Sequence, residues 1–460
     1  MVIQSAQNNF VNEGQIGVQS DCANRRSFHL LAQACEHIAG GDSSTMRVLP
    51  YHIPLVAERG KGSRLWDVDG NEYIDLNMAY GPLLLGHCAE PIINSVTRQI
   101  SQNGSQLGFP TEISSRVAEK IKRLYPSMEL MRFANSGTEA IASSVRLART
   151  YTGREKLIVF EGHYHGWSDA LFHRYHAEIA DLPECGYAPA IPGTNGMSGA
   201  PNNAIVVRWN DLDLFEQVMK KYGSEVAAVI MEPVMGNAGL IPPDPQFLAG
   251  VREVTQDHDS LLIFDEVITG FRVHPQGAQE LYGVYPDITI VSKAMGGGYP
   301  VAAFGASKEI MNLIVEGTLF HGGVYSANAT VMAASEAVLD TVLERTDEIY
   351  GQINSVSEQL AAGFREILNR RMIPHLVHQV GGVLSLLLTD GQIEKVTNYR
   401  DVKQHCQFEK YIQLQHFMQR AGVYFHPNQF EPMFLSSAHS KEDIETVLNR
   451  FDEAVRNVWL

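Results

Sequence analysis

The sequence contains few cysteines, and none of them falls in a pairing pattern. The five are far apart and irregularly spaced, without a Cys-x-x-Cys pair (Cys22, Cys35, Cys88, Cys185 and Cys406). This spacing argues against a disulfide framework and against a cysteine zinc site. Neither of the two close histidine pairs has a third ligand at a recognisable spacing, so no metal site is expected (His163 and His165; His173 and His176).

Long apolar runs and an excess of basic residues are missing as well. No uninterrupted apolar stretch approaches the ~20 residues of a membrane-spanning helix, and the N-terminus lacks the basic and apolar regions of a secretory signal. The 36 lysines and arginines stand against 52 acidic residues, which gives a formal net charge of −16. We therefore expect a cytoplasmic protein that binds neither nucleic acid nor membrane, and that binds anions only through local cations.

The 460 residues are 45% hydrophobic and 19% charged, which is typical of a globular chain with two or three lobes. Through the middle of the chain, short apolar runs alternate with amphipathic stretches of helical length. The runs lie at 157–160, 226–231, 261–264 and 288–291, and the clearest helices at 138–151 and 245–258. Near-continuous apolar strands between helices predict an α/β fold with a mostly parallel, doubly wound sheet.

The two ends of the chain differ from this middle part. The pattern predicts a hairpin at 64–76, long helices at 329–350 and 351–370, a strand at 380–388 and a closing helix at 441–457. We expect residues 1–75 and 331–460 to form a smaller α+β domain beside a large domain at 76–330. Residues 183–203 are rich in proline and glycine and lack periodicity, so they form either a plain surface loop or a lid.

A carboxylate and an amine follow two of the apolar runs. Ligands of open α/β sheets bind beyond the carboxyl ends of strands, so we expect Asp265 and Lys293 at the same rim. A lysine after a strand is usually just solvated, but the glycines at 296–298 allow close backbone approach here. Pyridoxal phosphate needs this pair, because a lysine forms its Schiff base and an acidic residue keeps its ring nitrogen protonated.

A phosphate cradle is predicted at 132–140. A strand-like run is followed there by Asn135, Ser136, Gly137 and Thr138, and then by a helix. Small hydroxyl residues and a glycine at a helix N-terminus present N–H groups and the positive end of the helix dipole to an anion. Alone, such a motif is more often a helix cap. Together with the Asp265 and Lys293 pair, it favours a phosphate site.

Five motifs in this order resemble those of the class III aminotransferases of fold type I, and most closely the glutamate-1-semialdehyde 2,1-aminomutase branch. They are FANSGTEA, EGHYHGW, MEPVMGN, FDEVITGFR and VSKAMGGGYP. The stretches RLWDVDGNEYIDL, YGPLLLGH and FEPMFLSSAHSKEDI also match, so the resemblance runs from about residue 45 to the end. It implies the fold type I α/β architecture, pyridoxal 5′-phosphate as cofactor, and a homodimer with its active site at the subunit interface.

The resemblance also assigns roles to single residues. Lys293 is implied to form the Schiff base and to move protons, and Asp265 to pair with the ring nitrogen. The other implied cofactor contacts are Ser136, Gly137 and Thr138 at the phosphate, Val267 and Tyr164 on the two ring faces, Glu232 and Asn237 near the phenolic side, and Gly323 and Val324 at the partner's phosphate. His165 is also implied to bind the cofactor. The implied substrate contacts are Ser44, Arg47, Tyr80 and Glu431, with Arg47 binding a carboxylate.

Two positions depart from the branch. Val324 stands where relatives usually have threonine, which removes a hydroxyl donor, and Tyr80 stands where the branch commonly has tryptophan. We therefore expect an aminotransferase that moves an amino group from a carboxylate-bearing amino donor to a keto acid or aldehyde acceptor, through pyridoxamine phosphate. An intramolecular aminomutase of the glutamate-1-semialdehyde type is the alternative. A non-catalytic binding protein is disfavoured, because Lys293, Asp265 and the cradle are all present.

Overall fold

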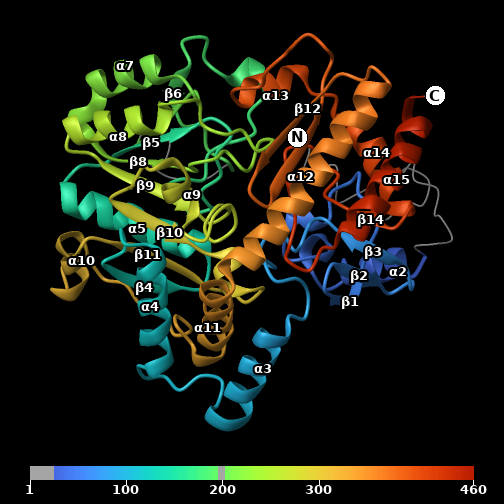
Figure 1. Cartoon of the computed structure of the whole chain (residues 1–460). Helices are drawn as coiled ribbons and strands as arrows, with labels where there is room; N and C mark the ends of the chain where they lie inside the picture. The colour runs from blue at the N-terminus through green and yellow to red at the C-terminus, as the bar shows by residue number, and fades with distance from the viewer. Residues whose placement is uncertain (1–24, 195–202, 460) are drawn as a thin grey trace.

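The computed structural model describes residues 25–194 and 203–459, and an eight-stranded sheet forms the centre of its larger part, on the left in Figure 1. The strands from β10 to β7 pair in parallel, whereas β11 is antiparallel to both neighbours and β6 is antiparallel to β7. The sheet is therefore mostly parallel, as the sequence predicts. Its order is β4 (Leu130–Ala134), β11 (Ala302–Ala306), β10 (Ile288–Val291), β9 (Leu261–Glu266), β8 (Val226–Met231), β5 (Lys156–Phe160), β7 (Ala204–Val207) and β6 (Tyr187–Pro189).

Helices cover both faces of this sheet, because its central strands are apolar throughout. In β5, Leu157 and Val159 pack with helices α5 and α10, whereas Ile158 and Phe160 pack with helices α7 and α8. Successive side chains of a strand point to opposite faces, so the alternation confirms the doubly wound architecture. The helices of this part are α3 (Glu90–Arg98), α4 (Glu112–Leu124), α5 (Gly137–Thr152), α7 (Leu212–Tyr222), α8 (Phe247–Asp257), α9 (Gly277–Tyr282), α10 (Lys308–Val315) and α11 (Ala329–Glu344).

Two smaller sheets bring distant parts of the chain together. The predicted hairpin is confirmed as β2 (Arg64–Asp67) and β3 (Glu72–Asp75); β1 (Ala57–Lys61) pairs with β2, and β14 (Val423–Tyr424) pairs in parallel with β3. The third sheet contains β12 (His375–Val380), β13 (Val383–Leu388) and β15 (Met433–Phe434). The remaining helices are α2 (Arg25–Ala34), α12 (Thr346–Arg370), α13 (Tyr399–His405), α14 (Phe408–Arg420) and α15 (Lys441–Trp459).

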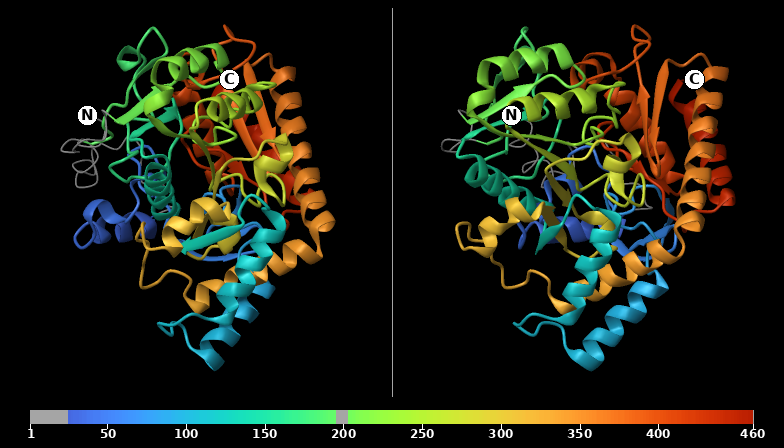
Figure 2. Two further views of the ribbon diagram at one scale, coloured as in Figure 1. Left: turned by 90° about the vertical axis from the view of Figure 1, so that its left-hand side faces the viewer. Right: turned by 60° about the vertical axis from the view of Figure 1, so that its left-hand side comes forward.

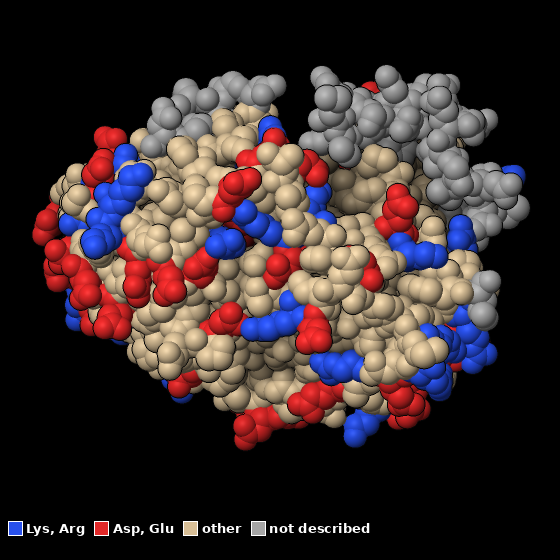
Figure 3. All heavy atoms as spheres, turned by 90° about the horizontal axis from the view of Figure 1, so that it is seen from above, with Lys and Arg blue, Asp and Glu red and all other residues tan. Residues whose placement is uncertain are grey.

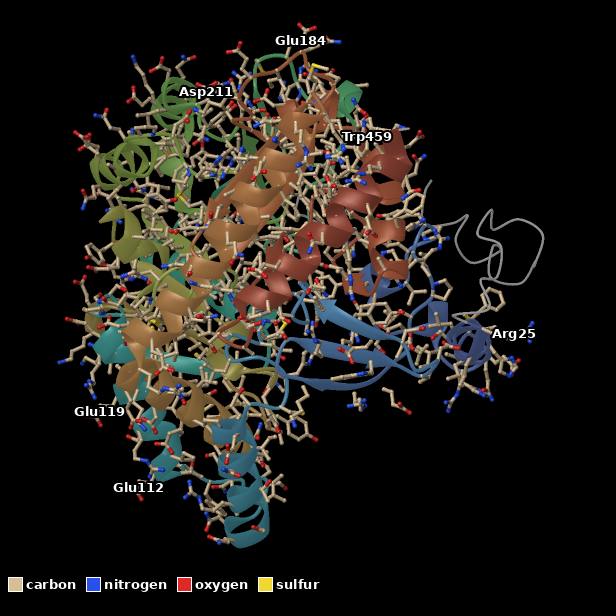
Figure 4. The ribbon with its side chains drawn as sticks, turned by 45° about the vertical axis from the view of Figure 1, so that its right-hand side comes forward. Arg25, Glu112, Glu119, Glu184, Asp211 and Trp459 are labelled. Carbon is tan, nitrogen blue, oxygen red and sulfur yellow. The ribbon has the colours of Figure 1, made fainter. Side chains whose placement is uncertain are left out.

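Long helices cover these smaller sheets. Both views of Figure 2 show α12 along one side of the molecule. In Figure 4, α12 and α15 lie side by side, with Trp459 at the end of α15. Their apolar faces meet where Phe364 contacts Phe451, with ring centroids 4.4 Å apart. The C-terminal segment therefore packs as one layer over strands from both ends of the chain.

The sequence predicts one helix over 329–350, but the structure breaks it at Arg345. The backbone there leaves the helical region, with φ −130° and ψ 34°, so α11 ends and α12 begins in a new direction. The apolar periodicity continues across the break and hides it. Asp347 and Glu348 in the first turn of α12 are the available signal, because acidic residues favour a helix start.

Two further expectations differ from the structure. The stretch 380–388 is not one strand, since a turn at Gly381 and Gly382 separates β12 from β13. Strand β6 lies inside the predicted 183–203 loop and pairs with β7. Residues 195–202 of that loop lie outside the described residues, so the choice between a surface loop and a lid stays open.

Charged side chains of both signs are interspersed on the face of the molecule seen in Figure 3. In the part of the chain that the structure describes, none of the helices combines the length and the apolar character needed to cross a membrane. The same residues contain no group of three or more His, Cys, Asp or Glu side chains that could hold a metal ion.

Candidate active site

Asp265 and Lys293 lie at the same rim of the central sheet. Asp265 belongs to β9 and Lys293 follows β10, and these strands pair in parallel with Asp265 opposite Ile290. Lys293 begins the 3-10 helix η7 (Lys293–Gly296) with φ at +41°, in the left-handed region. A non-glycine residue in that region carries about 1–3 kcal/mol of strain, which is characteristic of functional sites.

The Asp265 carboxylate is buried and held by two donors. His165 Nδ1 lies 2.8 Å from Asp265 Oδ2, and the Val267 N–H donates to Oδ1 at 3.1 Å. A buried carboxylate needs such partners, because its desolvation is otherwise costly. The contacts fix the direction in which Asp265 faces the site.

The Lys293 amine makes no hydrogen bond or ion pair with any residue that the structure describes. Burial lowers its pKa, and the nearby charge of Arg272 acts in the same direction. The carboxylates of Glu431, Glu232 and Asp265 oppose this effect. The amine is thus surrounded by charges yet has no fixed partner, as a group that must bond to a ligand and transfer protons requires.

Ser136, Gly137 and Thr138 lie where β4 passes into α5. The Ser136 hydroxyl accepts a hydrogen bond from the Glu139 N–H at 3.2 Å, so this side chain acts as a helix cap. The first N–H groups of a helix have no partner within it, so those of Gly137 and Thr138 are available to an anion. The backbone, more than the serine hydroxyl, makes this a cradle.

Two glycines let neighbouring segments close onto the cradle. A Cβ atom at Gly137 would lie 3.0 Å from Val267 Cγ2, and one at Gly166 would lie 2.5 Å from Thr138 Oγ1. Gly166 also has φ at +77°, which side chains disfavour. The cradle is therefore in direct contact with Val267 and with the segment that carries Tyr164 and His165.

Glu232 follows β8 and links the segment that carries Tyr164 to the turn at Gly236 and Asn237. Its carboxylate accepts hydrogen bonds from Tyr164 N (2.7 Å), Gly236 N (2.7 Å) and Asn237 Nδ2 (2.9 Å). Burial raises the pKa of Glu232 to about 7, although these donors favour the ionised form. The Tyr164 ring lies beside Tyr175, with centroids 5.0 Å apart.

Glu431 lies close to Lys293, and several tyrosines lie within reach of its charge. Burial raises the pKa of Glu431 to about 7, and the positive charge of Lys293 opposes this shift. Burial likewise raises the pKa of Tyr51, Tyr164 and Tyr175, and the charge of Glu431 adds to each shift. This arrangement can offer a substrate an acidic group next to the lysine, with tyrosine side chains nearby.

Ser44, Arg47 and Tyr80 come from two segments that are in contact, because the Tyr80 hydroxyl donates to the Met46 carbonyl at 3.1 Å. Arg47 ends the 3-10 helix η3 (Thr45–Arg47), and its side chain is 56% exposed with Nε 3.3 Å from Asp42 Oδ1. The Ser44 N–H donates to the same Asp42 oxygen at 2.7 Å. Burial raises the pKa of Tyr80, Glu431 adds to the shift and Arg47 opposes it.

The Gly323–Val324 turn is exposed in the single chain. Val324 is 80% exposed, and its carbonyl accepts a hydrogen bond from Gln106 Nε2 at 2.5 Å. A Cβ atom at Gly323 would lie 3.8 Å from Asn135 Nδ2, so the turn is also near the start of the cradle in its own chain. Its contact with a partner's phosphate stays a prediction.

Arg272 belongs to this site although sequence reasoning passes over it. Its guanidinium is fully buried, and Nη1 donates to Leu435 O at 2.6 Å while Nη2 donates to Gly81 O. It forms no ion pair with any described residue, and burial lowers its pKa to about 10. The motif FDEVITGFR contains this arginine, but its two carbonyl partners come from distant segments.

The described residues fit a phosphate-bearing aldehyde cofactor with a ring nitrogen. The Lys293 amine is unpaired, and the cradle offers backbone N–H groups to a phosphate. His165 Nε2 is buried without a partner among the described residues, while the same ring holds Asp265. Cationic, acidic and anion-binding groups thus lie together around Asp265 and Lys293.

Comparisons with known proteins agree with this geometry. Residues 46–455 match the family model described as Aminotransferase class-III. The chain is 38% identical over 437 residues to a glutamate-1-semialdehyde 2,1-aminomutase of Persephonella marina, which covers 94% of this chain and 99% of that protein. It is 39% identical over 428 residues to glutamate-1-semialdehyde 2,1-aminomutase 1 of Bacillus cereus, covering 92% and 96%.

Solved structures share the fold over nearly the whole chain. An omega-transaminase from Sphaerobacter thermophilus superposes with a TM-score of 0.87 at 29% identity, covering 95% of this chain and 98% of that one. A glutamate-1-semialdehyde-aminomutase from Pseudomonas aeruginosa superposes with a TM-score of 0.85 at 25% identity, covering 99% and 98%.

Proposed function

Because this chain belongs to the class III aminotransferase family, with pyridoxal 5′-phosphate as its cofactor, we propose that it is an aminomutase of the glutamate-1-semialdehyde type. It exchanges an amino group between neighbouring carbons of one carboxylate-bearing molecule. The observation that carries the proposal is the similarity to curated aminomutases, which extends over 94% of this chain and 99% of the relative. The sequence alone favours separate donor and acceptor molecules, and this similarity reverses that preference.

The residues of the chain have separate tasks in this reaction. The bound cofactor supplies an aldehyde carbon that holds the amino group and a ring that accepts electrons. Lys293 Nζ takes and returns protons, and the burial that lowers its pKa favours the neutral amine that this role requires. Asp265, oriented by His165, holds the ring nitrogen, and the N–H groups of Gly137 and Thr138 hold the phosphate.

The proposed substrate residues are Arg47 and Glu431, whose charges both act on Tyr80. Arg47 binds the substrate carboxylate, since it is an exposed cation next to the segment that Tyr80 contacts. Glu431 is the carboxyl group next to Lys293, and with a pKa of about 7 it can be protonated or ionised at neutral pH. An intermediate that stays bound between the two can be aminated again at the neighbouring carbon.

An aminotransferase with separate donor and acceptor is the second candidate. Tyr80 and Val324 support it, because both differ from the residues usual in the aminomutase branch. The superposition on an omega-transaminase with a TM-score of 0.87 also supports it. In this case the substrate pocket releases the first product before the acceptor enters.

A homodimer completes the proposal. Phe109, Phe320 and Val324 are large apolar residues that are 81%, 82% and 80% exposed in the single chain. Exposed apolar side chains of this size mark contact surfaces, and Gln106 joins the 105–109 segment to the Gly323–Val324 turn. The domain division expected from the sequence, 1–75 and 331–460 beside 76–330, stays a proposal with one boundary moved. Helix α11 packs against α3 and α4 of the large domain, so we propose that the described residues of the small domain are 25–75 and 345–459, in line with the β3–β14 pairing.

Turnover without a co-substrate tests the proposed reaction. The holoenzyme is incubated with glutamate-1-semialdehyde and no keto acid or other amine, and the isomeric amino ketone is measured. We expect sustained turnover that Lys293→Ala abolishes. Turnover only after a keto acid or a second amine is added would reject the aminomutase and establish the aminotransferase. A panel of amino donors, followed by the change in the cofactor's visible absorption, then identifies the donor.

A further inference from the structure

Two side chains from distant segments contact the same backbone carbonyl oxygen next to Arg47. The carbonyl oxygen of Met46, the residue before Arg47, accepts a hydrogen bond from the Tyr80 hydroxyl at 3.1 Å. His426 Nε2 lies 3.1 Å from the same oxygen, although it is 380 residues away in the sequence. Two distant segments thus converge on the residue next to the proposed carboxylate-binding arginine.

The hydrogen bonds of His426 define its protonation. Its Nδ1 accepts from the Asn428 N–H at 3.1 Å, so the ring proton is on Nε2, which can donate to Met46. Burial lowers the pKa of His426 to about 4, so this neutral tautomer is present at neutral pH. The ring is 1% exposed and has no competition from solvent.

A second histidine holds the other side of Arg47. His52 Nδ1 lies 3.2 Å from the carbonyl oxygen of Arg47, and its ring packs edge-on against His426 with centroids 5.0 Å apart. The carbonyl groups on both sides of the Arg47 Cα atom are therefore fixed by imidazole rings. Only the guanidinium end, paired with Asp42, is free to exchange its partner for a substrate.

The Tyr80 hydroxyl is aimed by an uncommon backbone turn. Met78, Ala79 and Tyr80 all have positive φ, at 44°, 56° and 66°, and Gly81 follows at 103°. Consecutive non-glycine residues in the left-handed region are rare and persist where surrounding contacts hold them. Here Arg272 donates to the Gly81 carbonyl and keeps the turn in place.

We propose that His426 and Tyr80 are positioning residues that clamp the Met46 carbonyl and thereby hold Arg47 where the substrate carboxylate binds. This inference rests on the proposed function, in which Arg47 takes that carboxylate. It gives Tyr80 a role that differs from direct substrate contact, and it gives His426 a role that the motifs do not contain.

Histidine replacements of matched geometry test the clamp in the holoenzyme. His426→Gln keeps a donor near the position of Nε2, whereas His426→Asn keeps only a group near Nδ1. We expect amide hydrogen exchange over residues 44–48 to be faster in His426→Asn and in Tyr80→Phe, and to return toward the wild-type rate in His426→Gln. His375→Gln, on β12, controls for loss of a partly buried histidine elsewhere.

Kinetics with glutamate-1-semialdehyde then tests the consequence. Losing one hydrogen bond of this kind changes a binding constant roughly two- to thirteenfold. We therefore expect KM to rise by this factor, with little change in kcat. In an Arg47→Ala background, His426→Asn should raise KM no further, because it acts through Arg47. An equal further rise in that background would overturn the positioning role.

The two readouts separate this inference from the proposed function. Unchanged exchange over 44–48 in both His426→Asn and Tyr80→Phe would overturn the clamp, whatever the enzyme turns over. Faster exchange in these variants, together with a wild-type enzyme that does not convert the semialdehyde, would reject the proposed reaction and leave the clamp standing. Circular dichroism of each variant shows that the fold is kept.

Discussion

The imidazole of His165 and the carboxylate of Asp265 form a buried pair, with Nδ1 2.8 Å from Oδ2 and side-chain exposures of 0% and 3%. An ionised carboxylate only accepts hydrogen bonds, so Nδ1 carries the proton. The other ring nitrogen, Nε2, is buried without a partner in the described part of the chain. The direction of the Asp265 carboxylate is thus set by protein groups alone.

We expect His165→Ala to lower the free energy of unfolding by about 1–3 kcal/mol, because it leaves Asp265 Oδ2 buried without its donor. His165→Asn is the matched control, since its amide can reach the same oxygen from the position of Nδ1. Urea unfolding of the apoprotein measures both variants. If His165→Ala is as stable as the wild type, other contacts orient Asp265.

Gly137→Ala is expected to weaken cofactor binding. The added methyl group would lie 3.0 Å from Val267 Cγ2 and so force the cradle away from the wall that Val267 forms. Overpacking of this kind costs about 1–3 kcal/mol, which corresponds to a rise in the dissociation constant of roughly five- to 160-fold. Fluorescence titration of the apoprotein with pyridoxal 5′-phosphate measures it.

The double variant Gly137→Ala/Val267→Ala provides the control for that clash. Removing the Val267 methyl groups makes room for the new Cβ atom, so affinity should recover relative to Gly137→Ala. If both variants bind equally weakly, the clash with Val267 does not explain the loss of affinity in Gly137→Ala.

Val324→Thr should retain the cofactor better than the wild type if the 323–324 turn reaches the partner's phosphate. A hydrogen bond to a charged group such as a phosphate contributes about 1.5–3 kcal/mol, so loss of cofactor during dialysis should slow by roughly tenfold or more. Val324 is 80% exposed in the single chain, so the replacement does not disturb packing there. Val324→Ala is the control, and equal retention by both variants would remove this turn from the phosphate site.

Sequence patterns predict the parts of this fold that depend on residues close together in the sequence. The strand at 226–231 has the predicted bounds, because a fully buried parallel strand is apolar at every position. Asp265 and Lys293 meet at one rim because each follows such a strand and the two strands are neighbours. The cradle is likewise local, since a helix N-terminus is defined by adjacent residues.

Contacts between distant segments are the part that sequence patterns leave out. Arg272 donates to carbonyl groups of Gly81 and Leu435, and a backbone carbonyl carries no signature in the side-chain sequence. His426 reaches Met46 across 380 residues in the same way. The break at Arg345 is hidden for another reason, because a change of helix direction does not interrupt the apolar period on either side.

Glu431 makes the stability of the apoprotein depend on pH in a defined direction. Burial raises its pKa from 4.5 to about 7, so between these values the folded protein binds more protons at this site than the unfolded chain does. The free energy of unfolding that Glu431 contributes therefore falls as pH rises through this window, by at most about 3 kcal/mol. Glu431→Gln is neutral at every pH and lacks this loss.

We expect thermal unfolding of the two proteins to show the variant gaining stability relative to the wild type between about pH 5 and pH 8. A stability difference that is constant over this range would mean that the Lys293 charge keeps Glu431 ionised throughout, and that Glu431 reaches the substrate as a carboxylate.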